Sequence, residues 1–350
     1  MKDHLTFYDI HGFVTAVDPY VNGIFLKEYG FFRTTKDNVE NVDLYVKVWK
    51  GNKILPTRRA GGLRGLLLPL RPDENTLWYN FGMDATTVLE YCEALMWWED
   101  KTFFHAGAIG KNEEAFIFTG GGGVGKTSLV LNFLRRGYKY LGDDWILLGK
   151  QGIAYPLPKR IHIFDYNLKD EEIARKVLGS KRYYYSVLFG FFKVGERVAP
   201  NRYVRFLFQR FRPHFKVPIQ KLFQKVKIAP PSSVSRVFFL ERKDLEGEYI
   251  EVNKEVTNEE IATRLAFVNL FERNGFFREY YRYAYEFGVR NTKIEEKFNH
   301  DFNILLEAFK KTEIYRVYIP GGLDLTSFDL QSLLQENIKE KSHFPSNNFQ

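Results

Sequence analysis

Hydrophobic and polar positions in the first part of the chain follow the two-residue period of β-strands. The segment DLYVKVWKGNKIL at 43–55 alternates apolar and polar side chains before a Gly-Asn turn, which predicts a β-hairpin. The segment TLWYNFG at 76–82 predicts another strand. From residue 85 to about 99 the period lengthens to that of a helix, with Asp84 placed as its N-cap. Residues 1–100 are therefore expected to form a β-rich accessory region that ends in a helix.

A buried strand followed by a helix is predicted next. The run AFIFTG at 115–120 has the continuous apolar pattern of a strand that is buried on both faces. The segment TSLVLNFLRR at 127–136 has a helical period, and Gly137 behind it is a candidate C-cap. The segment YKYL at 138–141 predicts a short strand that runs into two aspartates. Strand, glycine loop, helix and strand together form an α/β unit.

The later elements extend this α/β pattern. WILLGKQGIAYPLP at 145–158 predicts two strands joined near 150–152, and VSRVFFLER at 234–242 and EIYRVYIPG at 313–321 predict one strand each. The capping box TNEE opens a helix that reaches about Arg273. Residues 341–350 are polar and are expected to be a disordered tail. The expected fold class is α/β, a mixed sheet flanked by helices over 101–340.

The segment GGGGVGKT at 120–127 fits G-x-x-x-x-G-K-[ST], the phosphate-binding loop. Glycines let consecutive N–H groups turn toward phosphate oxygens, and the following helix offers its N-terminal donors to the same anion. We expect Lys126 to contact the outer phosphates and Thr127 to ligate Mg²⁺, with ATP or another NTP as phosphate donor. The expected nucleotide-binding residues are Gly120, Gly121, Gly122, Gly123, Val124, Gly125, Lys126, Thr127 and Ser128.

A dinucleotide-binding turn is the competing interpretation of the same glycines. Gly120, Gly122 and Gly125 also satisfy G-x-G-x-x-G, and an acidic residue follows about twenty positions later. That turn has no use for a lysine and a hydroxyl directly after its last glycine, and it usually opens its domain. The phosphate loop is therefore favoured over a dinucleotide fold or a purely structural glycine turn.

The paired aspartates Asp143 and Asp144 follow a predicted strand beside the phosphate loop. Carboxylates in that position suit Mg²⁺ binding and proton transfer. An ordinary turn or helix cap is the alternative explanation of an Asp-Asp pair.

These residues and their spacing resemble HPr kinase/phosphorylase and the wider group of HPr-kinase-like proteins. In that family a histidine begins the segment leading into the phosphate loop, here FHAGAIGKNEEAFIFTGGGGVGKT, and a short strand leads to paired aspartates. The resemblance implies a P-loop kinase core of the HPr kinase/PEP carboxykinase type. It implies that Asp143 is the catalytic base for an acceptor hydroxyl, that His105 lies beside it, that Lys126 is catalytic, and that Asp144 helps to organise Mg²⁺.

The resemblance covers about 103–158 clearly and the closing strands more weakly. Ser128 stands where HPr kinases proper usually carry an acidic residue, and the family's later segment with a magnesium-binding glutamate is not found. The chain is therefore expected to be a divergent kinase that phosphorylates a hydroxyl of a protein, a peptide or a small molecule. A membrane-associated sugar or prenol kinase and a nucleotide-binding regulator without phosphotransfer remain alternatives. HPr kinases form hexamers, so the resemblance also suggests a homo-oligomer.

Residues 180–230 are expected to form a basic aromatic insertion in the kinase domain. Between 201 and 227 the chain has no Asp or Glu but carries the cations Arg202, Arg205, Arg210, Arg212, Lys216, Lys221, Lys225 and Lys227. Three interpretations stay open: a helical layer with a solvated basic face, a lid for an anionic acceptor, and peripheral membrane contact through 200–227. Nucleic-acid binding is disfavoured because no such module is recognisable.

Composition narrows the class of protein. The 350 residues are 45% hydrophobic and carry a formal net charge of +8, which favours anionic partners. The one cysteine, Cys92, excludes an intramolecular disulfide framework and a cysteine-based zinc site. The first residues lack the apolar region of a signal peptide, and no uncharged run reaches the ~18 residues of a membrane-spanning helix. A cytoplasmic location is therefore expected.

Overall fold

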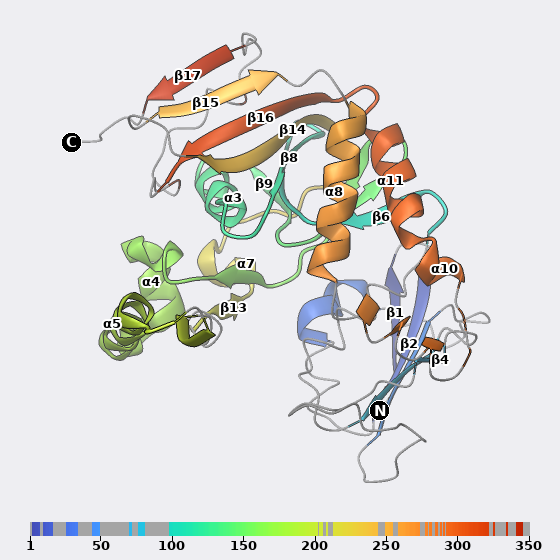
Figure 1. The fold of residues 1–350 in the computed structure, drawn as a ribbon, viewed down its shortest axis with the longest axis horizontal. Coiled ribbons are helices and arrows are strands. Elements are labelled where there is room, and N and C mark those ends of the chain that lie inside the picture. Colours follow the sequence, from blue (N-terminus) through green and yellow to red (C-terminus); the bar gives the residue numbers. More distant parts are fainter. Residues whose placement is uncertain are drawn as a thin grey trace. The chain divides into compact units, whose positions relative to one another are not determined.

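The structure is a computed structural model, shown as a ribbon in Figure 1. It describes residues 2–7, 10–16, 26–33, 44–49, 70–71, 76–80, 98–201, 203–205, 208, 213–243, 249–254, 258–273, 277–278, 280–281, 284–285, 288, 290, 292–321, 325, 334 and 341–345. The second half of the predicted hairpin at 50–55 and the predicted helix at 85–97 lie outside these residues. Residues 98–100 are not helical, so the prediction that this helix reaches residue 99 is wrong.

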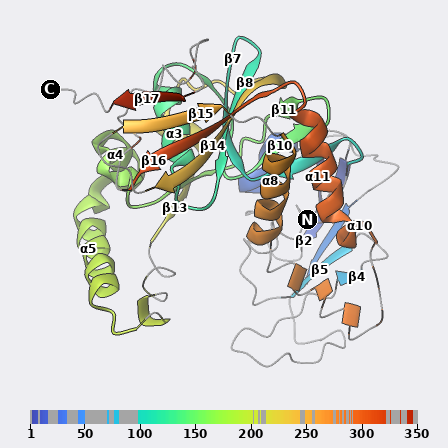
Figure 2. The same cartoon turned by 45° about the horizontal axis from the view of Figure 1, so that its top comes forward.

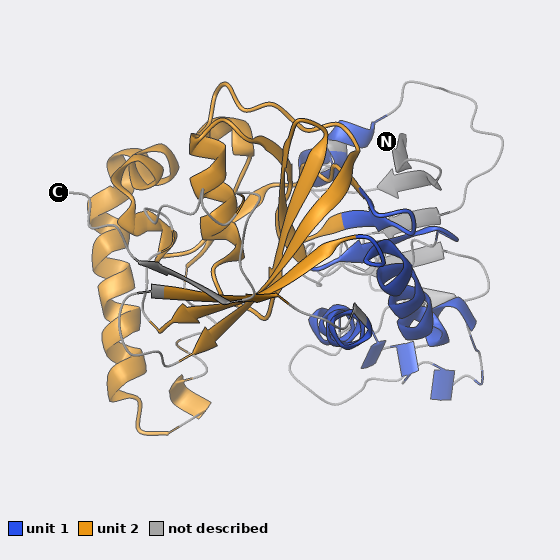
Figure 3. Ribbon diagram, turned by 90° about the horizontal axis from the view of Figure 1, so that it is seen from above, with its two compact units in different colours: residues 1–105, 147–153, 257–311 blue, residues 106–146, 154–256, 312–350 orange. Residues whose placement is uncertain are grey.

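The chain divides into two compact units, coloured separately in Figure 3. Unit 1 comprises residues 1–105, 147–153 and 257–311, and unit 2 comprises 106–146, 154–256 and 312–350. Each unit is assembled from three separate segments of the chain.

In unit 2, strands form a mixed sheet around the predicted phosphate-loop strand. β8 pairs in parallel with β14, which pairs in parallel with β16, and β8 pairs antiparallel with β7, which pairs antiparallel with β9. β15 and β17 extend the sheet beyond β16. The bounds are β7 Ala106–Lys111, β8 Glu114–Gly120, β9 Lys139–Gly142, β14 Ser232–Lys243, β15 Tyr249–Lys254, β16 Glu313–Pro320 and β17 Lys341–Pro345.

Strand β17 corrects the expectation of a disordered tail. Its residues form an antiparallel ladder with β15, from the pair Tyr249 and Pro345 to the pair Asn253 and Lys341. The polar composition of the tail did not reveal this pairing, because the unpaired N–H and C=O groups of an edge strand supply hydrogen bonds that composition does not encode. Residues 346–350 lie outside the described part of the chain.

Strand direction brings the chemically important loops of unit 2 to one edge of the sheet. Because β8 and β9 are both antiparallel to β7, they run in the same direction. The phosphate loop follows β8 at Gly120, and Asp143 follows β9 directly after Gly142. β14 is parallel to β8 and pairs Leu240 with Gly120, so its end lies at the same edge. Ligands commonly bind at the carboxyl ends of strands in such sheets.

Stacked aromatic rings hold helix α3, Lys126–Arg135, against the sheet. Phe118 of β8 stacks on Phe133 of α3 with ring centroids 5.5 Å apart, and on Phe238 of β14 at 5.6 Å. Phe238 stacks in turn on Tyr315 of β16 at 5.7 Å. All four side chains are buried, and burying each contributes about 1.5–3 kcal/mol. The prediction of a buried strand followed by a helix is confirmed, and Gly137 has the left-handed φ of 83° expected after a helix end.

The segment between residues 161 and 222 forms a layer of helices with a short two-stranded ribbon in unit 2. β12 pairs antiparallel with β13. Helix α4 begins after Asp170, which accepts a hydrogen bond from the backbone N–H of Ile173 at 3.0 Å and forms an ion pair with Arg135 of α3. The bounds are β12 Ile161–Ile163, η2 Asn167–Lys169, α4 Glu171–Leu178, η3 Gly179–Lys181, α5 Arg182–Val198, β13 Phe215–Val217 and α7 Ile219–Leu222.

Unit 1 contains an N-terminal sheet whose strands follow the order β1-β2-β3-β5-β4 in the described residues. The predicted strands near 44 and 76 are confirmed as β3 and β5, and these pair in parallel. Helices α8 and α11 lie side by side (Figure 2), and both pack on β6. The bounds are β1 Lys2–Phe7, β2 Ile10–Ala16, η1 Gly30–Phe32, β3 Leu44–Trp49, β4 Leu70–Arg71, β5 Thr76–Asn80, β6 Lys101–Phe104, α8 Asn258–Glu272, α10 Thr292–Glu295 and α11 Lys297–Ala308.

The remaining strand predictions are also confirmed. β10, Ile146–Gly149, and β11, Ile153–Tyr155, are joined where expected, and Gly152 in the turn has a φ of 76°. The predicted class, an α/β fold with a large mixed sheet flanked by helices, is thus the one observed. Among the described residues, no helix has both the length and the apolar character needed to cross a membrane.

Candidate phosphate-binding site

Two glycines of the loop after β8 are required by the fold. Gly120 has a φ of 135°, and a Cβ there would lie 2.4 Å from the backbone oxygen of Leu240 on β14. Gly125 has a φ of 112°, and its Cβ would lie 2.5 Å from the side chain of Leu325. Both φ values are unfavourable for residues with a side chain. These are the two glycines that the phosphate-loop pattern demands. The close approach of Leu240 explains the first, and that of Leu325 explains the second.

The three glycines between them face open space. Gly121, Gly122 and Gly123 are exposed, and a Cβ on any of them would have no heavy atom of the described residues within 4 Å. Only Gly123, with a φ of 75°, has a backbone conformation that favours glycine. Packing therefore does not explain Gly121 and Gly122. Bare backbone facing open space is suited to close approach by a ligand oxygen.

Lys126 begins α3 and folds back over the loop. Its Nζ donates hydrogen bonds to the backbone oxygens of Gly120 at 3.0 Å and Gly121 at 2.9 Å. The side chain is buried. The lysine charge is therefore held at the loop itself.

Thr127 and Asp143 join the two loops. The hydroxyl of Thr127 donates a hydrogen bond to Oδ2 of Asp143 at 2.9 Å. Asp143 is almost fully buried, and its other oxygen, Oδ1, has no hydrogen-bond partner among the described residues. A Cβ on Gly107 of β7 would lie 3.1 Å from that oxygen and 2.7 Å from Val130. A glycine in β7 thus leaves room for a carboxylate oxygen that lacks a partner.

The environment of Asp143 raises the pKa of its carboxyl group to near neutral pH. Burial, and secondarily the charge of Asp144, raise the pKa of Asp143 from 3.8 to about 7. The hydrogen bond from Thr127, the charge of Lys126 and the backbone N–H of Asp144 act in the opposite direction. A carboxylate with a pKa near the working pH is well matched to accepting a proton during a reaction.

Asp144 directly follows and has a left-handed backbone, with φ of 71°. This conformation costs of order 1 kcal/mol or more for a residue other than glycine. Among the described residues, no group of three or more His, Cys, Asp and Glu side chains is close enough to form a metal centre. The hydroxyl of Thr127 and the carboxylates of Asp143 and Asp144 are oxygen donors of the kind that Mg²⁺ takes together with water and phosphate oxygens. Thr127 and Asp144 fit such a bound ion, and Oδ1 of Asp143, which lacks a partner among the described residues, remains available to accept a proton.

Ser128, predicted among the nucleotide-binding residues, has a second connection. It is buried, and its Oγ accepts a hydrogen bond from Nδ2 of Asn167 at 3.1 Å. Oδ1 of Asn167 accepts a hydrogen bond from the backbone N–H of Phe164 at 3.1 Å. Asn167 thus ties the 164–167 turn to the first turn of α3. Sequence reasoning missed Asn167, since no local pattern marks a side chain that pairs across 39 positions.

A ladder of rings beside the aspartates was also missed. Tyr166 stacks on Phe164 at 5.5 Å, Phe164 on His214 at 5.7 Å, and His214 lies 5.7 Å from His162. Burial raises the pKa of Tyr166 to about 12, with contributions from the charges of Asp143 and Asp165. Burial lowers the pKa of His162 to about 4, against the charge of Asp144. The alternation in IHIFDYN was the signal available in the sequence, and the pairing of β12 with β13 completes the ladder.

A cation at the end of β14 was also overlooked. Nη1 of Arg242 donates a hydrogen bond to the backbone oxygen of Pro320 at 2.7 Å. Its Nη2 would lie 3.7 Å from a Cβ on Gly125. The guanidinium therefore lies beside the phosphate loop, where it adds positive charge to that of Lys126.

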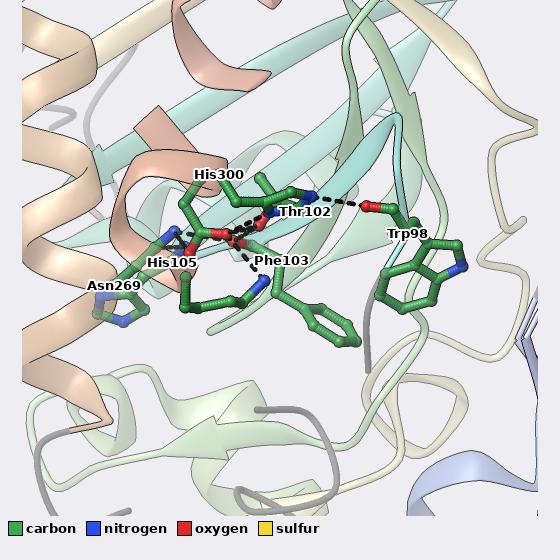
Figure 4. Close-up of polar contacts among 8 residues, drawn as sticks. Trp98, Thr102, Phe103, His105, Asn269 and His300 are labelled. Carbon is green, nitrogen blue, oxygen red and sulfur yellow. Dashed lines mark hydrogen bonds and ion pairs between the residues drawn. The ribbon is translucent and has the colours of Figure 1, made fainter. Parts of the chain in front are cut away.

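His105, the residue before β7, belongs to unit 1 and lies beside Asn269 of α8 (Figure 4). It is buried, its backbone N–H donates to Oδ1 of Asn269 at 3.1 Å, and its Nδ1 lies 3.6 Å from a carboxylate oxygen of Glu272. Asn269 also donates to the backbone oxygen of Phe103 at 2.9 Å. Helix α8 thus fixes the strand that leads to His105. Its placement beside Asp143 stays a prediction from the family resemblance.

A buried ionic cluster in unit 1 supports the same strand (Figure 4). Oδ1 of Asp301 accepts a hydrogen bond from Thr102 at 2.5 Å and lies 2.8 Å from Nζ of Lys297. Burial opposes the charge of Asp301, but Lys297, His300 and Arg273 hold its pKa below the ordinary value. Burial lowers the pKa of Lys297, and Asp301 offsets part of that effect.

Comparison with known proteins gives no family assignment. No protein-family model matches the chain, and no curated protein matches it significantly. Function is therefore inferred from the site.

Proposed function

We propose that this chain is a Mg²⁺-dependent kinase of the HPr-kinase-like group, which transfers the terminal phosphate of ATP or another NTP to a hydroxyl acceptor. The observation that carries the proposal is the hydrogen bond from Thr127 to Asp143. It joins the end of a phosphate loop to a buried carboxylate with a pKa of about 7 and one unengaged oxygen. A phosphate nest and a proton acceptor at one edge of a sheet are the two parts that phosphoryl transfer to an alcohol needs.

Each residue has a distinct role in this proposal. The backbone N–H groups of 120–125, Lys126 and Arg242 hold the phosphates, and the open space beside Gly121 and Gly122 accommodates their oxygens. Thr127 and Asp144 hold Mg²⁺, which when bound neutralises charge on the phosphates. Asp143 accepts the acceptor's hydroxyl proton. The acceptor oxygen then forms a bond to the terminal phosphorus. The bond between that phosphorus and the bridging oxygen breaks at the same time, and the nucleoside diphosphate leaves.

A regulator that binds nucleotide without phosphotransfer would explain the loop but gives no reason for the environment of Asp143. Such a protein would not need a buried carboxylate beside the loop with one oxygen that lacks a hydrogen-bond partner among the described residues. The kinase proposal is therefore preferred. A cytoplasmic location, proposed from the composition of the chain, and a homo-oligomeric state, proposed from the family resemblance, are parts of the proposal.

The proposal is tested by phosphate transfer to an unknown acceptor. Purified protein, Mg²⁺ and γ-labelled ATP or GTP are incubated with a cell extract fractionated into proteins, peptides, small metabolites and lipids, and the labelled product is identified. We expect one labelled alcohol phosphate that is absent with Asp143→Asn. If the protein binds nucleotide but no fraction contains a labelled product, the result would instead support a nucleotide-binding regulator.

A further inference from the structure

Helix α5 carries a continuous apolar stripe on its solvent side. Its members recur every three or four residues, so they lie along one face of the helix. They are 58–82% exposed, although large apolar side chains usually pack inside a protein. The stripe consists of Tyr183, Tyr184, Val187, Phe191, Val194 and Val198.

The opposite face of α5 packs inward and fixes the orientation of the helix in unit 2. Tyr185 contacts Phe215 of β13 edge to face with ring centroids 4.9 Å apart, and Phe192 lies 6.2 Å from Phe208. Gly195 is buried, and a Cβ there would lie 2.3 Å from the ring of Phe208. The helix is therefore held by its own inner face. Two members of the outer stripe also contact inner-face rings, Tyr184 on Tyr185 and Phe191 on Phe208, but both stay 62% exposed.

Positive charges border the stripe. Arg182, Lys193 and Arg197 are exposed and, at 100° per residue, lie together along one side of the apolar face. Between residues 181 and 227 the sequence contains twelve Lys or Arg residues and a single acid, Glu196, which is only half-buried on the inner side. An apolar stripe with aromatic residues and a cationic border is the pattern of a helix that lies in a membrane interface.

We propose that α5 docks unit 2 on an anionic lipid surface, with its apolar stripe in the interface and its cations among the headgroups. A second copy of this chain fits the face less well. A two-fold contact through α5 would bring the bordering cations of both copies together. Glu171 of α4 offsets Arg182 at 3.1 Å, and Glu196 is the single acid of the sequence between 181 and 227. Anionic headgroups complement the same charges. The inference concerns binding alone and does not depend on the proposed phosphotransfer.

The test is sedimentation with vesicles of phosphatidylcholine alone or with about 30% phosphatidylserine. The 350-residue protein should bind the anionic vesicles, and binding should weaken as salt rises from about 0.1 to about 0.5 M. Phe191→Ser should weaken binding at least about tenfold, because one buried aromatic side chain is lost from the interface. Lys193→Glu should weaken it at least about fivefold, and only for the anionic vesicles.

Phe271→Ser is the matched control, because Phe271 is comparably exposed but lies on α8 in unit 1. It should bind vesicles as the parent does. Absence of binding to anionic vesicles overturns the proposal, as does binding that Phe191→Ser leaves unchanged in a variant with the parent's melting temperature. Lipid-free self-association that Phe191→Ser abolishes also overturns it and assigns the stripe to a second copy.

Discussion

The hydroxyl of Thr127 donates a hydrogen bond to Oδ2 of Asp143 at 2.9 Å, although the rest of α3 and the whole of β9 separate the two residues in the sequence. The contact follows from strand direction. β8 and β9 both run antiparallel to β7, so the residues after each strand meet at one edge. Oδ1 of the same carboxylate is left without a partner in the described part of the chain. The catalytic predictions depend on this pair.

Asp143→Asn should leave nucleotide affinity within about threefold of the parent but lower phosphate transfer by about 10²–10⁴-fold. The amide is isosteric with the carboxylate but cannot accept the proton of an alcohol. Calorimetric titration of nucleotide and the rate of labelled product formation measure the two effects. Thr127→Ser is the control, since it retains the hydroxyl that contacts Asp143. Undiminished transfer by Asp143→Asn is incompatible with the proposed base.

The same carboxylate should make stability depend on pH. The pKa of Asp143 is 3.8 ordinarily and about 7 in the folded protein, so the folded state binds the proton more tightly. Its contribution to stability is therefore complete below pH ~4 and is lost as the pH rises through about 7. Asp143→Asn should remove this decline in stability. The melting temperature of the variant, relative to that of the parent, should therefore be higher at pH 8 than at pH 4. Melting temperatures of both proteins across that range measure the difference.

His162 should contribute pH dependence of the opposite sign. Its pKa falls from 6.5 to about 4 on folding, so the unfolded chain binds the proton more tightly. Stability is then lost as the pH falls from about 6.5 toward 4. His162→Phe should flatten that acid limb of the melting-temperature profile. If the melting temperatures of the variant and the parent change with pH in parallel, His162 must be protonated as readily in the folded protein as in the unfolded chain.

Alanine at two glycines of the loop should separate ligand binding from folding. Gly121→Ala places a methyl in open space, so stability should change by less than about 0.5 kcal/mol, while nucleotide affinity should fall at least about tenfold. Gly125→Ala should destabilise the fold by about 1–3 kcal/mol, since φ is 112° and Leu325 is too close. Urea unfolding and nucleotide titration provide the two measurements. An unchanged affinity for Gly121→Ala would mean that no ligand approaches that backbone.

Asn167→Ala should destabilise unit 2 by about 1–3 kcal/mol, because it leaves the N–H of Phe164 and the hydroxyl of Ser128 without their partner. Ser128→Ala should lower the free energy of unfolding by less than Asn167→Ala does, since the side chain it removes is smaller. In the double variant the two losses should not add, because both break the same hydrogen bond. Urea unfolding of the four proteins in the cycle measures this coupling. Fully additive losses would show that the two side chains act independently.

Asp301→Ala should destabilise the fold by about 3–5 kcal/mol, because Lys297 would keep a buried charge without its carboxylate. The double variant Asp301→Ala/Lys297→Met should recover part of that loss. Chemical unfolding of both variants compares the two. A double variant no more stable than Asp301→Ala alone would mean that the charge of Lys297 does not dominate the cost.

Sequence patterns located the strand, glycine loop and helix at 114–135 correctly because their determinants are local. The apolar run of β8, the period of α3 and the glycine after it each lie within about ten residues. Partners distant in sequence were not predictable in this way. Gly107 makes room for Asp143, and Asn167 reaches Ser128, only because the sheet brings separate strands and turns together. The stripe on α5 was equally obscure, since aromatic residues occupy both faces and only packing against Phe215 and Phe208 reveals which face is free.

The interleaving of the two units constrains how the protein can be made and dissected. The chain passes between the units at 105/106, 146/147, 153/154, 256/257 and 311/312. During synthesis, the parallel partner of β14, strand β16, emerges only after all of unit 1 has been translated. The sheet that presents the phosphate loop therefore completes late, and a fragment that ends before residue 313 lacks a central strand of it. Neither unit corresponds to one uninterrupted stretch of coding sequence.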